Sequence, residues 1–192
     1  MIISAVLGKE KFMTTVEPIR NIDHLHKLEN YLAKKNPRDL LLLTLGINCG
    51  LRISDIVALN VGDVRNKSYI QIIEKKTGKY KKFPINAKLK PMFEQFTNGK
   101  RPEEPLFKTI FNNRLDRFGA YYILKAASNA ICLDEKIGTH TMRKTFGYHH
   151  YKKFKDVAIL QKIFNHSTPQ ITLRYIGIEQ DQIDNSYNNF IL

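Results

Sequence analysis

The stretch HTMRKTFGYHHYKKFKDVAILQKIFNHSTPQITLRY, at residues 140–175, holds most of the features that decide how this chain folds. Its pattern predicts three consecutive helices, at residues 141–154, 156–164 and 169–175. A Ser-Thr-Pro sequence opens the third helix, because Ser or Thr caps a helix and Pro suits its first turn. The stretch begins with basic residues and ends on Tyr175, which is therefore expected at the end of a short helix.

The pattern of apolar residues changes in the middle of the chain. Residues 69–73 and 83–85 resemble strands that approach each other across Thr77-Gly78, which predicts a hairpin with a lysine-rich tip. A third short strand is expected at residues 63–65. Further helices are expected from residue 23 to the Asn36-Pro37 break and at residues 37–48, 54–59, 88–97, 112–132 and 180–190.

These patterns predict an α+β fold that is mainly helical, with one small antiparallel sheet of three strands. At 192 residues the chain is long enough for one domain with a single core. Residues 1–20 lack a clear period and are expected to form a lead-in segment. Residues 21–192 are expected to form one domain that ends in a C-terminal tail.

The composition is that of a folded protein, with 43% hydrophobic and 26% charged residues. The longest apolar run, LLLTLGI at residues 41–47, is too short to span a bilayer, so no membrane association is expected. The apolar cluster at residues 1–7 lacks the preceding basic region of a signal peptide. Cys49 and Cys132 lie far apart in apolar surroundings, which favours reduced core thiols over a disulfide or a metal site. We therefore expect a cytoplasmic protein.

Positive charge is the main clue to the partner of this protein. Lys and Arg number 31 and Asp and Glu 18, which gives a net charge of +13. Such a surplus favours polyanions as partners, although a generally cationic surface without a dedicated ligand would give the same total. The charges are clustered, since five lysines lie within residues 75–82 and five basic residues within residues 143–155. Clusters of this kind bind phosphates.

The chain also holds residue types that phosphoryl-transfer chemistry can use. Cleaving a phosphodiester without water or metal needs an attacking oxygen, positive donors on the non-bridging oxygens, and an acid for the departing alkoxide. Tyrosine can attack phosphorus and hold the strand end as an ester. Arginine donates two parallel hydrogen bonds to phosphate oxygens, and lysine can protonate a leaving oxygen. Candidates for these three roles are Tyr175, Arg52 with Arg143, and Lys76.

Two histidines accompany these candidates. His140 and Arg143 are three positions apart at a helix start, so both project to one face and can address the same phosphate. His166 precedes Tyr175 by nine positions, and one turn followed by one helix brings the tyrosine back toward it. A zinc site built from the histidines is not expected, because their spacing is unsuitable and no Cys or acidic ligand is close by.

In type and in order, these residues resemble the tyrosine recombinase, or phage integrase, family. The resemblance covers about residues 20–190. It rests on five short sequence motifs, or boxes, each of which is weak evidence alone, whereas their joint occurrence is specific. It implies a helical catalytic domain with a small sheet that acts on double-stranded DNA through a 3'-phosphotyrosyl intermediate, with no metal, cofactor or small-molecule substrate. The boxes are GLRISDI with Arg52, the lysine hairpin with Lys76, HTMR with His140 and Arg143, NHS with His166, and finally Tyr175.

The resemblance implies a catalytic role for each of these six residues. Tyr175 would be the nucleophile and Lys76 the general acid. Arg52 and Arg143 would clamp the scissile phosphate. His140 would assist proton transfer, and His166 would donate a hydrogen bond to the phosphate.

Some positions near the site match or depart from the family pattern. Asp55 matches an acidic position in the first arginine box and is expected to orient neighbouring catalytic groups. Asn165 stands where the family usually has Gly, and Asn tolerates a left-handed backbone better than most residues. Met142 replaces a commoner leucine, which conserves volume. Family members usually carry a further helical domain that clamps the DNA, whereas only about twenty residues precede the resemblance here, as in a fragment or a small single-domain member.

Chemistry alone leaves alternatives for two of the assignments. Lys75 and Lys79 lie on the same hairpin as Lys76, and the family pattern is what favours Lys76. Tyr151 and Tyr187 are other candidate nucleophiles, but neither follows a His-Ser turn.

The sequence therefore predicts a site-specific DNA recombinase or integrase that works as a homo-oligomer, a tetramer on two DNA sites. A type IB topoisomerase-like enzyme would use the same residues to relax one duplex, and a DNA-binding regulator would use the basic surfaces without catalysis. Retention of all six candidate residues argues against the regulator, since binding needs charge and not this arrangement. The tail, residues 182–192, could pack in its own domain or against a neighbouring protomer.

Overall fold

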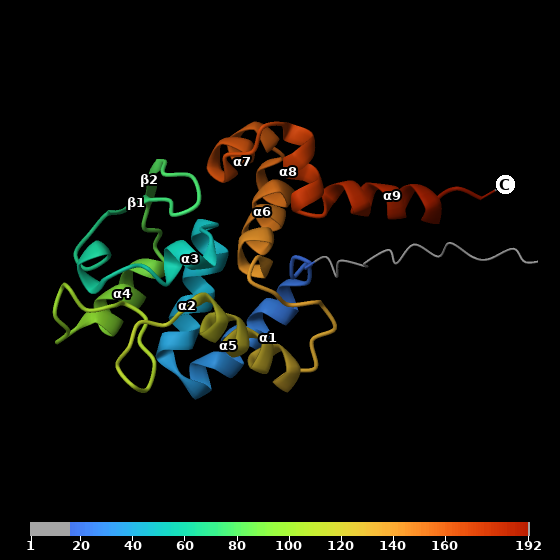
Figure 1. The fold of residues 1–192 in the computed structure, drawn as a ribbon. Coiled ribbons are helices and arrows are strands. Elements are labelled where there is room, and N and C mark those ends of the chain that lie inside the picture. Colours follow the sequence, from blue (N-terminus) through green and yellow to red (C-terminus); the bar gives the residue numbers. More distant parts are fainter. Residues whose placement is uncertain (1–15, 192) are drawn as a thin grey trace, which may run out of the picture.

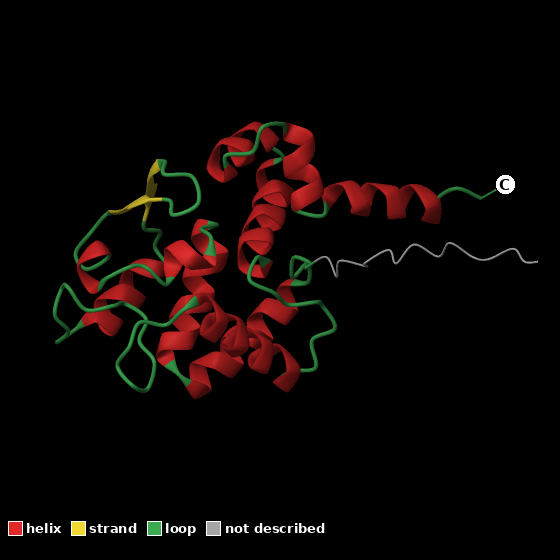
Figure 2. Ribbon diagram, in the orientation of Figure 1, coloured by secondary structure: helices red, strands yellow, loops and turns green. Residues whose placement is uncertain are grey.

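A computed structural model describes residues 16–191 of the chain. The prediction of a mainly helical fold with one small antiparallel sheet is confirmed (Figures 1 and 2). The helices are α1 (Ile22–Lys35), α2 (Pro37–Cys49), α3 (Ile53–Ile56), the 3-10 helix η1 (Val61–Asp63), α4 (Leu89–Thr97), α5 (Arg117–Ala130), α6 (Thr141–Phe154), α7 (Val157–Phe164), α8 (Pro169–Tyr175) and α9 (Ile178–Asn188), and the strands are β1 (Tyr69–Ile73) and β2 (Tyr80–Pro84).

Two clusters of buried apolar side chains hold these elements together. The larger one lies among α1, α2, α3, α4 and α5, and includes the completely buried Leu42 and Leu45. The smaller one lies among α6, α7, α8 and the start of α9. Helix α6 belongs to both, because Met142 packs in the larger cluster and Tyr148 in the smaller one. Figure 1 accordingly shows α6 running from the block of α1–α5 toward α7 and α8.

Local capping explains why α7 and α8 begin where they do. The side chain of Asp156 accepts a hydrogen bond from the Ile159 backbone N–H at the start of α7. Thr168 does the same for Ile171 at the start of α8, and Pro169 occupies the first turn. Because these signals are local, the predicted bounds of α8 agree with the structure, as do those of α6.

The sheet has two strands, so the prediction of a third strand at residues 63–65 is wrong. Strand β1 pairs with β2 in antiparallel register, with Ile70 opposite Phe83. The segment before it instead forms a turn, in which Asn60 and Asp63 cap each other and the N–H groups of Val64 and Arg65 donate to the carbonyl of Val61. These short-range hydrogen bonds use the donors that a strand would need for pairing.

Helix α5 is shorter than expected, since the prediction placed its start at residue 112. Lys108 and Arg114 form an isolated β-bridge, and Asp116 then caps the helix by accepting from the N–H of Gly119 at 2.7 Å. Beyond its end, Cys132 is exposed with a positive φ of 53°. The expectation that Cys132 is a core thiol is therefore wrong, whereas Cys49 is half-buried in α2.

The two ends of the chain differ in how they meet the domain. Of the predicted lead-in, residues 1–15 lie outside the described part, while Ile19 is buried and its N–H donates to Thr145 Oγ1 at 2.9 Å. At the other end, Gly177 has a φ of 81° and redirects the chain into α9, which projects from the domain (Figure 1). Apolar side chains of the tail are exposed there, namely Ile183, Tyr187, Phe190 and Ile191. In the described residues the tail thus leaves these side chains uncovered.

We expect Gly147→Ala to destabilise the domain despite the higher helix propensity of Ala. A Cβ atom at Gly147 would lie 2.6 Å from Ile176 Cγ2 and 2.7 Å from the ring of Phe164, both of which are buried. Overpacking of this kind costs about 1–3 kcal/mol, more than the gain of about 0.5–1 kcal/mol in propensity. Urea denaturation should show the loss, whereas Gln170→Ala on the exposed surface of α8 should stay within about 0.5 kcal/mol of wild type. Equal stability of the two variants would contradict the close packing of α6 on α7 and α8.

Candidate active site

Arg143 is the central cation of the candidate site. It lies in the first turn of α6, is only 3% exposed, and donates to the carbonyl oxygens of Gly50 at 2.5 Å and Phe164 at 2.9 Å. Its guanidinium also stacks on the Phe164 ring, with Cζ 4.3 Å from the ring centre. These contacts connect the start of α6 with the ends of α2 and α7.

Arg52 lies beside this cation because of the turn that ends α2. Gly50 adopts the left-handed conformation at the helix end, with a φ of 63°, and Arg52 then occupies the N-cap position of α3. Its Nη1 donates to Glu74 Oε1 at 2.7 Å. The positive charges of Arg52 and Arg143 are close enough that, beyond the effect of burial, both lower the pKa of His166, and the charge of Arg52 also lowers the pKa of Arg143.

Tyr175 ends α8 and returns to the start of α6, so the described residues of one chain bring the tyrosine to these cations. Its hydroxyl lies 3.3 Å from His140 Nδ1. Its ring makes edge contacts with Phe164 and His166, at centroid distances of 5.5 Å and 5.1 Å. The ammonium of Lys144 lies 5.3 Å from the centre of the same ring. Rings and cations on several sides thus fix the direction of the phenol.

His166 is placed by a left-handed residue, as the sequence suggested. Asn165 ends α7 with a φ of 55°, and His166 donates its backbone N–H to Gln161 at 3.0 Å. One nitrogen of its ring, Nδ1, lies 3.1 Å from Thr172 Oγ1. Asn165 therefore supplies the left-handed residue that this turn requires.

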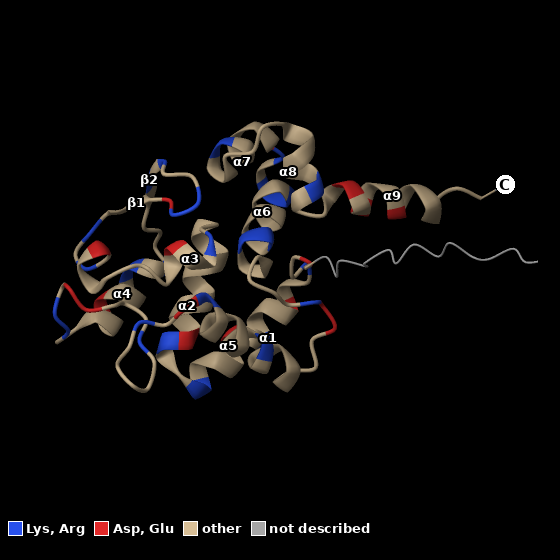
Figure 3. Ribbon diagram, in the orientation of Figure 1, with Lys and Arg blue, Asp and Glu red and all other residues tan. Residues whose placement is uncertain are grey.

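Lys76 lies on the exposed turn between β1 and β2. It lines an open groove of about 610 Å³ together with Arg52 and His140. Figure 3 shows the basic hairpin turn near α3 and the basic residues along α6. The remaining residues that line this groove are Ile53, Ser54, Lys75, Arg117, Phe118 and Thr139. The structure thus gathers four predicted residues around Tyr175, namely Arg52, His140, Arg143 and His166, and places Lys76 at the groove that leads to them.

Glu74 is a member of this site that the sequence interpretation missed. Its side chain is completely buried and forms ion pairs with Arg52 at 2.7 Å and Lys81 at 3.0 Å. The available signal was an acidic residue at the end of an apolar strand, immediately before a lysine cluster. An isolated acid next to several bases is usually solvated, and only the fold shows that this one is buried among cations.

Asp55 has a narrower role than the resemblance implied. Its Oδ1 accepts a hydrogen bond from the backbone N–H of Lys75 at 3.0 Å. Asp55 therefore holds the backbone next to Lys76, rather than contacting a catalytic side chain directly.

The environment of the site favours neutral histidines and a neutral tyrosine. Burial, together with the charges of Arg143 and other nearby bases, lowers the pKa of His140 below its ordinary value. Burial and the charge of Arg143 lower the pKa of His166 to about 4. Burial raises the pKa of Tyr175, although Arg143 opposes this. At neutral pH, His140 can therefore accept a hydrogen bond from the phenol.

The described residues contain neither a candidate metal site nor a candidate membrane-spanning helix. No group of three or more His, Cys, Asp and Glu side chains in residues 16–191 is arranged to hold a metal ion. Within the same residues, none of the helices has both the length and the apolar character needed to cross a bilayer.

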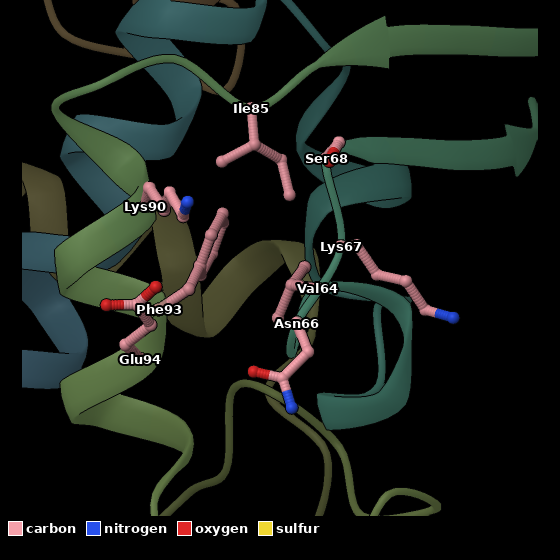
Figure 4. Close-up of a pocket in the computed structure, with 8 residues that line it drawn as sticks. All are labelled: Val64, Asn66, Lys67, Ser68, Ile85, Lys90, Phe93 and Glu94. Atoms are coloured by element: carbon pink, nitrogen blue, oxygen red, sulfur yellow. The ribbon is translucent and has the colours of Figure 1, made fainter.

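A second hollow, of about 210 Å³, lies between α4 and the segment that enters β1 (Figure 4). Ile85 and Phe93 face it, while the side chain of Lys67 points away. None of the six predicted residues lines it, so it is separate from the candidate site. Its complete lining is Val64, Asn66, Lys67, Ser68, Ile85, Lys90, Phe93 and Glu94.

Sequence comparison places this site in a known family. Residues 19–181 match the profile described as "Phage integrase family". The chain belongs to this family. The family includes the tyrosine recombinases, which are DNA strand-transferring enzymes, and the resemblance seen in the sequence is confirmed.

Two relatives show how the length of this chain compares with the lengths of known family members. It is 46% identical over 179 residues to "Probable integrase/recombinase YoeC" of Bacillus subtilis (strain 168), which covers 93% of this chain and 98% of that protein. It is 27% identical over 184 residues to "Tyrosine recombinase" of Pseudothermotoga lettingae, which covers 88% of this chain and 64% of that protein. The chain thus matches YoeC over nearly its whole length but spans less than two-thirds of the longer recombinase.

Solved structures share the fold. The crystal structure of XerA recombinase superposes with a TM-score of 0.73 at 16% identity, covering 91% of this chain and 65% of that chain. The catalytic domain of bacteriophage HP1 integrase superposes with a TM-score of 0.63 at 23% identity, covering 83% of this chain and 86% of that chain. The agreement concerns the architecture, which is that of a tyrosine recombinase catalytic domain.

We expect the His166 ring to titrate near pH 4, well below the ordinary value of 6.5. The unfolded chain would then bind more protons than the folded one as the pH falls from 6.5 toward 4, so the free energy of unfolding should decrease over that window. Nuclear magnetic resonance of the ring protons checks the pKa, and urea denaturation at several pH values checks the stability. His166→Asn should flatten the pH dependence in this window. A His166 ring that titrates at its ordinary value would contradict the burial and the proximity to Arg143.

Proposed function

We propose that this chain is a site-specific DNA recombinase or integrase that breaks and rejoins strands through a 3'-phosphotyrosyl intermediate. One observation carries the proposal: the Tyr175 hydroxyl lies 3.3 Å from His140 Nδ1, beside the buried Arg143. A tyrosine that merely fills space does not need a neutral imidazole at its hydroxyl and a buried guanidinium next to its ring. A nucleophile (Tyr175), a proton acceptor (His140) and a hydrogen-bond donor to the phosphate (Arg143) are thus available at one point.

In the cleavage step, the Tyr175 oxygen attacks the phosphorus and its proton passes to His140 Nδ1. The phosphorus–tyrosine bond forms as the bond to the 5'-oxygen breaks. That oxygen leaves as an alkoxide and takes a proton from Lys76, which the exposed hairpin turn can bring to the groove. Attack by a different 5'-hydroxyl reverses these transfers and reseals the strand without an external energy source.

The two arginines and His166 would stabilise the phosphate during transfer. The planar guanidinium groups of Arg52 and Arg143 suit two non-bridging oxygens. Because Arg143 is held by two carbonyl groups, it requires little reorganisation when charge develops on the phosphate. In the tautomer whose Nδ1 accepts from the Thr172 hydroxyl, the Nε2–H of His166 can donate a hydrogen bond to the phosphate.

Double-stranded DNA is the substrate that best fits the groove beside this site. Lys75, Lys76 and Arg117 line the groove, and the whole chain carries a charge of +13. These residues would bind backbone phosphates, so binding should weaken steeply with added salt. A structural relative is described as a lambda integrase dimer bound to a core site. Action on DNA agrees with the cytoplasmic location that we infer for this chain.

Strand exchange requires several protomers, and we propose a tetramer on two DNA sites. The exposed apolar side chains of α9, such as Tyr187 at 79% exposure, support assembly because they need a cover. We also propose residues 21–192 as the catalytic domain, a range that includes most of the family match.

A topoisomerase-like enzyme remains the alternative with the same chemistry. Such an enzyme would relax supercoils as a monomer and give no recombinant products. Incubation with supercoiled plasmids that carry two candidate sites separates the two functions, because recombination changes the connectivity of the DNA and relaxation does not.

Tyr175→Phe should abolish the covalent adduct between protein and DNA. The substrate is nicked DNA that carries the recognition site, from which the cleaved fragment diffuses away and traps the ester, and denaturing gels reveal the adduct. Tyr151→Phe is the matched control and should trap DNA like wild type. Equal trapping by wild type and Tyr175→Phe would show that another residue is the nucleophile.

Lys76→Ala should slow cleavage by about 100-fold or more, because general acid catalysis contributes about 10²–10⁴-fold. Replacing the bridging 5'-oxygen with sulfur should restore the rate, since a thiolate leaves without a proton. Lys75→Ala and Lys79→Ala are controls on the same hairpin and should show a smaller loss and no such rescue. If sulfur rescued Lys75→Ala instead, Lys75 would be the general acid.

A further inference from the structure

Glu74 contributes a carboxylate at the centre of a cationic site. Its side chain is completely buried, and Oε1 accepts from Arg52 Nη1 at 2.7 Å and from Lys81 Nζ at 3.0 Å. The second oxygen, Oε2, accepts from Thr77 Oγ1 at 2.7 Å. Three donors therefore hold this carboxylate, and one of them is an arginine of the proposed phosphate clamp.

The backbone of Glu74 also closes the turn that carries Lys76. Its carbonyl accepts from the N–H of Gly78 at 2.8 Å, and its own N–H donates to the carbonyl of Lys79 at 2.9 Å. Thr77, which reaches the Glu74 side chain, directly follows Lys76 in the chain. One residue thus connects the clamp arginine with the turn that carries the proposed general acid.

Lys81 extends the same network to the opposite side of the site. Its ammonium donates to the carbonyl oxygen of Ile163, near the end of α7. Lys79 donates to Asn165 Oδ1 at 2.8 Å, directly before His166. The hairpin is therefore attached to the segment that places His166, as well as to Arg52.

The hydrogen bonds around the Glu74 carboxylate favour its ionised form. Burial alone would raise the pKa of this carboxyl, but hydrogen bonds from Thr77, Lys81 and Arg52 prevail and lower it to about 2. Burial lowers the pKa of Lys81, and the charges of Arg143 and Arg52 lower it further, while Glu74 opposes both effects. A permanent negative charge at Glu74 thus offsets repulsion among cations that would otherwise move apart.

We propose that Glu74 is a positioning residue that aims Arg52 and the Lys76 turn at the same scissile phosphate. The inference rests on the proposed function, since it assigns Arg52 and Lys76 their roles. Glu74 itself would not touch the DNA, because its side chain is completely buried. It accepts from one nitrogen of the Arg52 guanidinium, Nη1, so the other donors of Arg52 stay available for phosphate oxygens. Loss of its charge should therefore slow the chemical step more than it weakens DNA binding.

The test compares Glu74→Gln with Glu74→Asp in single-turnover cleavage of nicked site DNA at saturating protein. Gln keeps the shape but not the charge, and we expect the rate to fall about 10- to 100-fold, because small misplacements of reacting groups cost this much. Asp keeps the charge and should recover part of the rate. The Kd for DNA should stay within about threefold of wild type. Asp39→Asn removes a remote ion pair of Arg38 and is the matched control, with an unchanged rate expected.

Two further variants keep the proposal testable if Glu74→Gln folds poorly, which thermal melting would show. Thr77→Val removes one hydrogen bond to Glu74 and should cost about three- to tenfold in rate. In an Arg52→Ala background, Glu74→Gln should add less than its effect in wild type, because one of the two groups that Glu74 positions is gone.

The outcomes separate this inference from the proposed function. Absence of any adduct with wild-type protein would overturn the function itself. A normal adduct with wild type, together with an unchanged rate for well-folded Glu74→Gln, would overturn only the positioning role. Full additivity with Arg52→Ala would also overturn it.

Discussion

A buried guanidinium holds the two parts of this fold together. Arg143 lies at the start of α6 and donates to carbonyl groups of Gly50 and Phe164, at the ends of α2 and α7. Helix ends carry unpaired carbonyl groups with partial negative charge, so they suit a cation that has lost its water. Because an unpaired buried charge is very costly, α2 and α7 must both remain in place around Arg143. The larger core, which includes α2, and the smaller core, which includes α7, are thereby fixed relative to each other.

This arrangement concentrates positive charge where an anionic substrate would bind. Burial lowers the pKa of His166, and the positive charges of Arg143, Arg52 and Lys81 lower it further, to about 4. Glu74 is the counter-charge that makes the cluster tolerable in the absence of DNA. The charges of the free site are therefore arranged in advance, and a phosphate bound there would require little reorganisation of the surrounding groups.

Local signals in the sequence predicted some parts of this structure well. The bounds of α6 and α8 follow from residues within one turn of each end, and the order of Arg52, Lys76, His140, Arg143, His166 and Tyr175 indicated the family. Features that depend on distant contacts were not predictable. Residues 63–65 alternate polar and apolar side chains as a strand does, but hydrogen bonds to the carbonyl groups of Asn60 and Val61 hold them in a turn. The burial of Glu74 depends on Arg52 and Lys81 arriving from other segments, and no local pattern reveals that.

The wide separation of the site residues along the chain has a consequence for synthesis. Arg52 is synthesised before Tyr175, and α6 must join both cores before the two can meet. Domains fold as units while the chain emerges, and contacts between distant segments form late. A growing chain therefore exposes basic segments before Tyr175 has been placed beside Arg143. Under the proposed function, DNA cleavage would become possible once α8 has joined the smaller core and brought Tyr175 to the start of α6.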